Sequence, residues 1–166
     1  MDPATLKLLQ YFQVMTPTSD GQFISSPAWD PVTSTLLVSS PRDLASGLGP
    51  VSFSHGLVGF RLDASCNLTK VWNTVVGQSN DGSGSYVYSP PVIVGPPGQR
   101  VAFVATGFWN SVHAIRVGDG ALLWNATLDG GSTGAVFGAP SVANGTVLLG
   151  GWDYGTQGHA LYAFRL

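Results

Sequence analysis

The sequence contains no glutamate, a single cysteine and few charges of either sign. Its nine acidic residues are all aspartate, its seven Lys and Arg stand singly, and charged residues make up 10% of the 166 positions. Long exposed helices are usually rich in Glu, Lys and Arg, so this composition does not favour such helices. A net charge of -2 without a basic cluster also lacks the electrostatic footprint of a nucleic-acid binder. We therefore expect no nucleic-acid partner.

Long hydrophobic runs and groups of metal-binding residues are also missing. No stretch approaches the ~18 to 20 consecutive apolar residues that span a bilayer, and no basic flank precedes an apolar core at the N-terminus. We expect no membrane span and no targeting segment in the chain as given. Cys66 alone cannot form an internal disulfide, and zinc or iron–sulfur sites usually use several Cys or His at short spacings.

Glycine, proline and apolar residues are abundant instead. The chain has 22 Gly and 11 Pro, with 44% hydrophobic and 11% aromatic content. Gly and Pro interrupt regular elements, while the apolar content is sufficient to bury a core, which excludes a disordered, collagen-like or coiled-coil chain. The composition predicts a compact protein rich in short β-strands.

Three similar units follow one another along the chain. Each begins with a Ser-Pro or Ala-Pro pair, continues through an apolar run and reaches a small-apolar-Arg-apolar segment, and the first two end on an apolar-Trp pair. Equivalent positions lie 49 to 63 residues apart, as three prolines and three apolar residues show: Pro27, Pro90 and Pro140, and Phe60, Ile115 and Phe164. The period is therefore near fifty residues.

Each unit is predicted to contain about four short antiparallel strands separated by Gly, Pro, Asn and Asp turns. Asn144-Gly145, for example, supplies the positive φ angles of a tight hairpin. A unit of this size cannot bury both faces of its own sheet, so copies must stack, and radial stacking gives a β-propeller. We expect an all-β fold, a partial β-propeller of about three four-stranded antiparallel blades in an incomplete ring. A β-sandwich does not explain the same order of features three times.

The whole chain is predicted to form one partial propeller. Its expected segments are the closing strand of a preceding blade, two blades and an incomplete last blade, over residues 1–15, 16–77, 78–131 and 132–166. Closed propellers typically use 4 to 8 blades, so three do not close a ring. We expect the C-terminal part of a longer propeller whose remaining blades are its partners, or self-association through open faces and sheet edges.

Three segments resemble the PQQ-like, or quinoprotein-type, propeller repeat, in which a strand, an Asp-rich turn, a Thr-Gly pair and an apolar-apolar-Trp segment follow one another. Residues 114–124 (AIRVGDGALLW) are the best match, and residues 58–72 are a looser copy. Residues 2–12 are similar to the closing part, with Gln10 in the Trp place, although a short helix capped by Asp2 is the alternative. Kelch repeats are a weaker match, because the glycine doublets do not recur at one register.

The resemblance implies a role for two tryptophans and a choice between two functions. In this family the Trp packs between adjacent blades, so Trp72 and Trp124 are expected to be structural blade-docking residues. Many proteins with the repeat are not enzymes, whereas its enzymes hold pyrroloquinoline quinone and calcium over the central funnel and oxidise alcohols or sugars. We expect a non-catalytic binding or scaffold module of an extracytoplasmic repeat protein, with a fragment of a quinone-dependent dehydrogenase as the alternative. No cofactor is evident in this chain itself.

Groups suited to quinone chemistry are present, but each has an ordinary structural explanation. Without Glu, an ion ligand or a base would be an aspartate, and the candidates lie in Gly-rich turns where Asp forms turn hydrogen bonds. They are Asp63, Asp119 and Asp153. Three arginines recur at one register and would either bind an anionic cofactor in the channel or lie exposed between blades; they are Arg61, Arg116 and Arg165.

The three histidines do not point to one catalytic pair. His55 and His159 hold equivalent places in separate units, and His113 falls in another register. Residues that act together must converge in space, and equivalent positions lie in separate blades. The sequence therefore assigns no catalytic and no metal-binding residue.

Three N-glycosylation sequons begin at Asn67, Asn125 and Asn144. They would carry glycans if the protein entered a eukaryotic secretory pathway, although so short a pattern also arises by chance in a chain rich in Thr and Asn. Together with the repeat, they lead us to expect a secreted, lumenal or periplasmic location.

Overall fold

A computed structural model describes the greater part of the chain and shows an all-β protein. The described residues are 25–40, 56–76, 87, 89–106, 111–128, 136, 138–153 and 158–165. The first sheet contains β1 (Ala28–Asp30), β2 (Thr35–Ser40), β3 (Gly56–Leu62) and β4 (Leu68–Thr74). The second contains β5 (Val92–Val94), β6 (Val101–Ala105), β7 (Ser111–Arg116) and β8 (Leu122–Thr127). The third contains β9 (Ser141–Ala143), β10 (Thr146–Asp153) and β11 (Gly158–Arg165).

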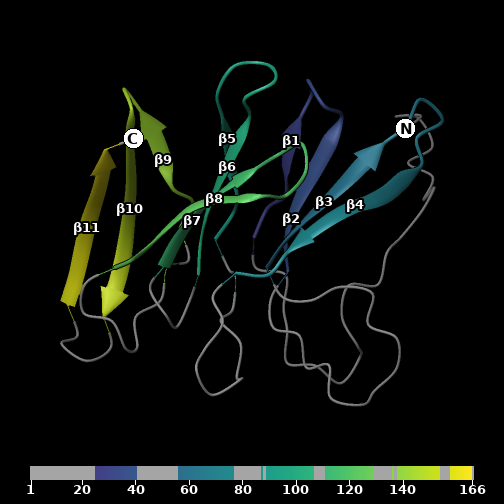
Figure 1. Cartoon of the computed structure of the whole chain (residues 1–166). Helices are drawn as coiled ribbons and strands as arrows, with labels where there is room; N and C mark the ends of the chain where they lie inside the picture. Colours follow the sequence, from purple (N-terminus) through teal and green to yellow (C-terminus); the bar gives the residue numbers. More distant parts are fainter. Residues whose placement is uncertain are drawn as a thin grey trace, which may run out of the picture.

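The three sheets are antiparallel meanders arranged as propeller blades in an incomplete ring. Each sheet follows chain order from one edge to the other, with four, four and three described strands, and none closes into a barrel. The sheets fan out side by side, and their first strands β1, β5 and β9 lie next to one another at the inner side of the fan (Figure 1). The predicted partial propeller is thus confirmed. The expected closing strand, residues 1–15, lies outside the described residues.

The same strand register recurs in the first two sheets. Gly59 on β3 lies opposite Trp72 on β4, and Ala114 on β7 lies opposite Trp124 on β8. In both pairs the register shifts immediately beyond this position, so that one residue bulges out of the outer strand just before the tryptophan. Such a β-bulge bends its strand and increases the local twist. The repeat seen in the sequence is therefore also a repeat of backbone geometry.

Tight turns between strands follow from local sequence. Asn144 and Gly145, which join β9 to β10, have φ angles of 49° and 68°. Two successive positive φ angles define the hairpin turn for which Asn-Gly is the preferred pair. The hairpin predicted at these two residues is confirmed.

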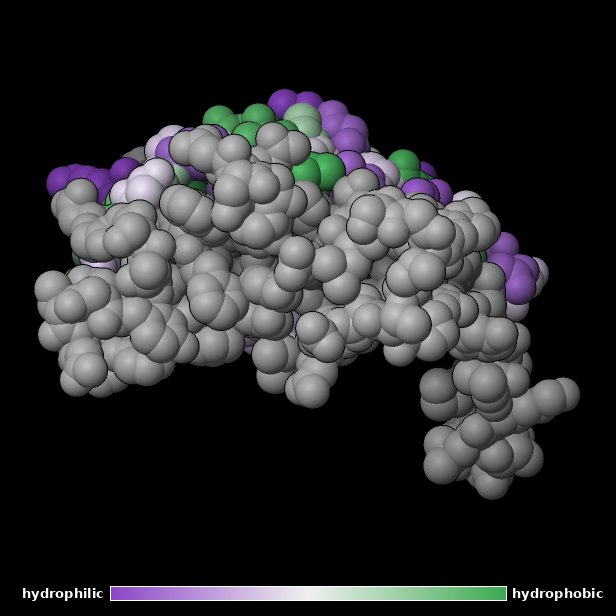
Figure 2. Space-filling view, turned by 90° about the horizontal axis from the view of Figure 1, so that it is seen from below, coloured by the Kyte–Doolittle hydropathy of each residue, from purple (hydrophilic) through white to green (hydrophobic). Residues whose placement is uncertain are grey.

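The core lies between the sheets, because each sheet buries an apolar face against the next. One cluster joins the first and second sheets and includes Leu37, Leu57, Trp72, Ala102, Val104 and Ile115. Another joins the second and third sheets and includes Phe103, Val112, Ala114, Val147 and Leu149. In the view from below, the described residues that can be seen lie along one border, where hydrophobic and hydrophilic residues lie beside one another (Figure 2).

Candidate functional site

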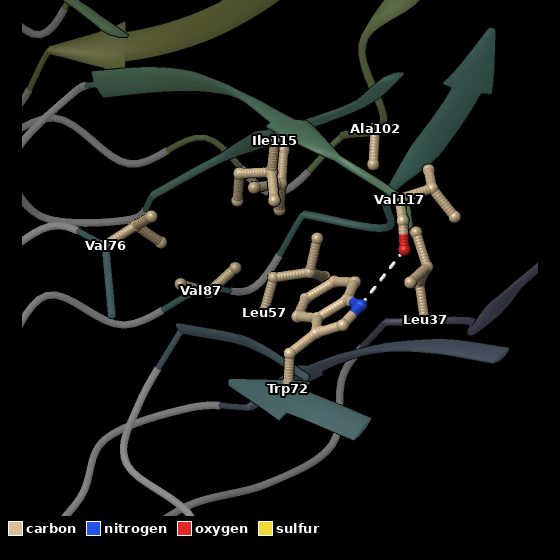
Figure 3. Packing of buried hydrophobic residues seen from close by; sticks show 9 residues of the cluster. Leu37, Leu57, Trp72, Val76, Val87, Ala102, Ile115 and Val117 are labelled. Carbon is tan, nitrogen blue, oxygen red and sulfur yellow. Dashed lines mark hydrogen bonds between the residues drawn. The ribbon is translucent and has the colours of Figure 1, made fainter. Parts of the chain in front are cut away.

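Trp72 is the more deeply buried of the two predicted docking residues, and it lies at the interface between the first and second sheets. Trp72 projects from β4 with 9% of its surface exposed. Its ring lies between Leu57 and Leu37 of its own sheet and Ile115 of the second sheet (Figure 3). The indole Nε1 donates a hydrogen bond of 3.0 Å to the carbonyl oxygen of Val117. The side chain thus buries apolar area and satisfies its polar atom within the same interface.

Two glycines make room for this ring, one from each sheet. A Cβ atom at Gly59, opposite Trp72 on β3, would overlap the indole. A Cβ atom at Gly120, in the turn between β7 and β8, would come within 2.7 Å of the indole Cδ2. Gly120 also has a φ of 75°, which L side chains rarely adopt. Its carbonyl oxygen accepts a hydrogen bond from the hydroxyl of Thr74 at the end of β4.

Trp124 lies at the next interface but is much less enclosed. It meets Phe164 of the third sheet edge to face, with ring centroids 5.4 Å apart and an interplanar angle of 68°. It keeps 36% of its surface exposed. In the repeat, the residue equivalent to the Val117 acceptor is Leu166, which lies outside the described residues. Trp72 and Trp124 therefore both contact the following sheet, with unequal burial.

An ion pair that the sequence analysis did not predict links the inner strands of the first two sheets. Asp30, at the end of β1, is 1% exposed, and its Oδ1 lies 3.4 Å from Nε of Arg100 before β6. The Asp30 carboxylate also accepts hydrogen bonds from the backbone N–H and hydroxyl of Thr33, at 3.2 and 2.6 Å. Arg100 donates from Nη1 to the carbonyl oxygen of Gly95 at 2.7 Å. Neither residue is repeated in the other units, so the period could not reveal them.

A chain of buried hydroxyl and imidazole groups lies at the start of β7. The Ser111 hydroxyl is 2.7 Å from the Thr106 hydroxyl and 2.9 Å from Nε2 of His113. His113 is 5% exposed, and its Nδ1 has no hydrogen-bond partner. Burial lowers the pKa of His113 from 6.5 to about 4, so the imidazole is neutral at pH 7. A neutral ring with Nε2 protonated donates to Ser111 and leaves Nδ1 as a bare acceptor.

The two described aspartates among the candidates each close a turn. The Asp63 carboxylate accepts backbone N–H bonds from Asn67 and Ser65, both at 2.8 Å, and the bond from Asn67 is the main reason that the pKa of Asp63 is lowered. Asp119 accepts a bond from the backbone N–H of Ala121 at 3.0 Å, which is the largest cause of its lowered pKa. Both are exposed. Their oxygens are occupied by the turn geometry for which Asp is suited.

The remaining candidate residues either lie apart from one another or fall outside the residues that the structure describes. The three arginines are exposed at one register, and Nη1 of Arg116 is 2.8 Å from Oδ2 of Asp119. His55 and the side chains of Asp153 and His159 lie outside the described part of the chain. Within that part, no group of three or more His, Cys, Asp or Glu residues is placed to hold a metal ion. Nor does that part include a helix long and apolar enough to cross a membrane.

The three sequon asparagines are all exposed but differ in local geometry. Asn144 lies in the β9–β10 turn, whereas Asn125 lies within the outer strand β8. Nδ2 of Asn67 donates to Oδ2 of Asp63 at 3.2 Å. A glycan on Asn67 would replace one of the two hydrogens on this Nδ2 and leave the other for Asp63, while Asn144 lies in an exposed turn.

Comparisons with known proteins add no relative. No protein-family model matches the sequence, and no curated protein matches it. The fold and the contacts between its sheets are therefore the basis for a functional proposal.

Proposed function

We propose that this chain is a non-catalytic segment of an extracytoplasmic PQQ-like repeat protein, in which it serves as a scaffold or binding module. The observation that supports this role most directly is how three aspartates and His113 are used. Asp63 and Asp119 close turns, Asp30 pairs with Arg100, and His113 is buried in a hydroxyl network. These groups stabilise strands and the contacts between them.

The alternative implied by the repeat is a fragment of a quinone-dependent alcohol or sugar dehydrogenase. Pyrroloquinoline quinone is anionic, so its binding would draw on exposed cations at one end of the sheets. Arg61 and Arg165 are exposed there at one register, while Arg116 already pairs with Asp119. This difference gives matched variants for a test.

The test is a titration of the full-length protein with pyrroloquinoline quinone and calcium. Tryptophan fluorescence reports binding, and reduction of a dye in the presence of alcohols or sugars reports turnover. The scaffold role predicts neither saturable quenching nor dye reduction. Saturable quenching with turnover, weakened by Arg61→Gln and Arg165→Gln but not by Arg116→Gln, would overturn it in favour of the dehydrogenase.

A further inference from the structure

The outer strand of the second sheet carries one of the three sequons on an exposed edge. Asn125, Ala126 and Thr127 all belong to β8, which pairs with β7 on one side and with no other described strand on the other. The first and third sheets pack against the two faces of this sheet, and neither pairs with its outer edge. The side chain of Asn125 is exposed at this edge.

Exposed apolar side chains accompany the sequon along the same strand. Leu122 and Leu123 are each 45% exposed, and the six residues of β8 include no charge. An edge strand that combines exposed apolar side chains with backbone groups on an open side is a place where a strand of another molecule can pair. A protein that stays unassociated needs a feature that prevents such pairing at β8.

The first sheet has a charged residue where the second sheet has an apolar one. Lys70 on β4 lies opposite Phe60 of β3. Leu122 on β8 lies opposite Ile115, which holds the place of Phe60 in β7. Charged side chains, lysine above all, commonly protect an edge strand from pairing. The outer strand β4 therefore has a charge at this place, whereas β8 has none.

The register also distinguishes Asn125 from the asparagine that holds its place in the first sheet. Asn73 lies opposite Val58 on β3, as Asn125 lies opposite His113 on β7. Asn73 is partly buried and begins no sequon, because Val75 stands where a Ser or Thr is required. The second sheet thus has an exposed sequon on the outer strand that lacks a charge.

The β-bulge of β8 brings the sequon side chain next to an apolar one. Leu122 lies opposite Ile115 and Asn125 lies opposite His113. Residues two positions apart in a strand share a face of the sheet, and so do residues that lie opposite each other. Leu122 and Asn125 therefore lie on the same face, and a group attached to Asn125 begins beside Leu122.

We propose that Asn125 carries an N-linked oligosaccharide and that this glycan protects the outer edge of β8 from pairing with strands of other molecules. The proposal rests on the extracytoplasmic location of the proposed function, because the sugar donor, an oligosaccharide on a lipid pyrophosphate, is used in the secretory pathway. Nδ2 of Asn125 bonds to the anomeric carbon, and the bond from that carbon to the pyrophosphate oxygen breaks. The pyrophosphate keeps the electron pair, and one amide proton is released. The bulky, hydrophilic sugar then covers Leu122 and the open side of β8.

The occupancy test uses the protein purified from its natural source. Peptide N-glycosidase in heavy-oxygen water converts a glycosylated asparagine to an aspartate that contains this oxygen, and a digest without the enzyme is the control. Mass spectrometry of the peptides reports Asn67, Asn125 and Asn144 separately, and Asn125 should be labelled. A protein found outside the cytoplasm with Asn125 unlabelled would overturn the proposal and leave the scaffold role intact. A cytosolic protein would overturn the extracytoplasmic location and the glycan with it.

Two substitutions at Thr127 test whether the glycan protects the edge. Thr127→Ala removes the sequon and leaves Asn125 in place, whereas Thr127→Ser keeps the sequon. Light scattering is measured across a concentration series on the full-length proteins secreted by eukaryotic cells. The Thr127→Ala protein should form larger species, while the unchanged protein and Thr127→Ser should not. Equal behaviour of the two variants would overturn the protective role.

A second substitution separates an open edge from a failure to fold. Leu122→Lys in the Thr127→Ala protein gives β8 the charge that Lys70 gives to β4. If the open edge causes the association, the added lysine should return the protein to the mass of a single unglycosylated chain. Larger species that persist with Leu122→Lys would assign the association to another cause and overturn the protective role. The cofactor titration that tests the scaffold role is independent of both measurements.

Discussion

The buried imidazole of His113 should make the stability of this protein fall as the solution is acidified from pH 6.5 to pH 4. In the folded chain burial lowers the pKa of His113 to about 4, whereas the unfolded chain has the ordinary value of 6.5. Above pH 6.5 the ring is neutral in both states and adds no pH dependence. Between the two pKa values the unfolded chain binds a proton that the folded chain does not, so folding becomes less favourable.

The magnitude follows from the difference between the two pKa values. A difference of about 2.5 pH units, at ~1.4 kcal/mol per unit, corresponds to a loss of about 3 kcal/mol by pH 4. A loss of this size is a large fraction of the ~5 to 15 kcal/mol by which domains are stable. The pKa values of Asp63 and Asp119 are lowered in the folded chain from the ordinary value of 3.8. The stability that these two carboxylates contribute is therefore lost only at a pH more acidic than the range in which His113 acts.

The assay is urea unfolding followed by tryptophan fluorescence at pH 7, 6, 5 and 4. The control is His113→Val, because the equivalent residue of β3 is Val58, which is fully buried. The variant should lose the slope between pH 6.5 and 4 while remaining folded at pH 7. Equal slopes for the two proteins would refute the burial argument. Nitrogen NMR of the imidazole at pH 7 should show the proton on Nε2, because the other tautomer would leave a buried N–H donor at Nδ1 without a partner.

Three further predictions concern the contacts between the sheets. Trp72→Ala should lower the free energy of unfolding by roughly 3 to 5 kcal/mol in a denaturant titration, since the ring is buried, and Trp124→Ala should cost clearly less because 36% of that side chain is exposed. Equal losses would contradict the difference in enclosure. Gly120→Ala should destabilise by about 1 to 3 kcal/mol, because its φ of 75° strains an alanine and its Cβ would meet the Trp72 ring; Gly118→Ala, with open space around its Cβ, is the control. Asp30→Ala should cost about 3 kcal/mol by leaving Arg100 without its carboxylate, whereas Asp119→Ala, at an exposed pair, should leave the unfolding midpoint nearly unchanged. A neutral result for Asp30→Ala would show that Arg100 finds another partner.

The sequence predicted those features of the fold that recur from unit to unit. The period near fifty residues indicated stacked antiparallel sheets, and the Asn144-Gly145 pair indicated its hairpin. Both depend on local turn chemistry and on apolar residues at repeated places, which are visible in a single chain. The unequal burial of Trp72 and Trp124 was not predictable in this way, because it depends on which elements of the next sheet reach each ring.

The buried polar contacts were not predictable from the sequence for a related reason. Asp30 ends a strand of the first sheet, Arg100 lies in a hairpin of the second, and neither residue is repeated in the other units. The two residues meet only when the sheets stack. Thr106, Ser111 and His113 are a similar case, since a hydroxyl or imidazole in a strand gives no sign of what lies beside it. The Asp30–Arg100 contact is a property of the assembled interface, whereas the hydroxyl and imidazole contacts lie within the β6–β7 hairpin of one sheet.

The two interfaces differ in how strongly they fix the relative position of their sheets. The first combines the Trp72 bond to Val117 with the Asp30–Arg100 pair, and the Ser39 hydroxyl donates to the carbonyl oxygen of Ser89 at 2.7 Å. A sliding movement of the second sheet would break these directional contacts, whereas apolar side chains tolerate small shifts. The contacts described for the second interface are the apolar cluster and the edge-to-face pair of Trp124 with Phe164. The directional contacts of the first interface should therefore hold the second sheet in a fixed position against the first.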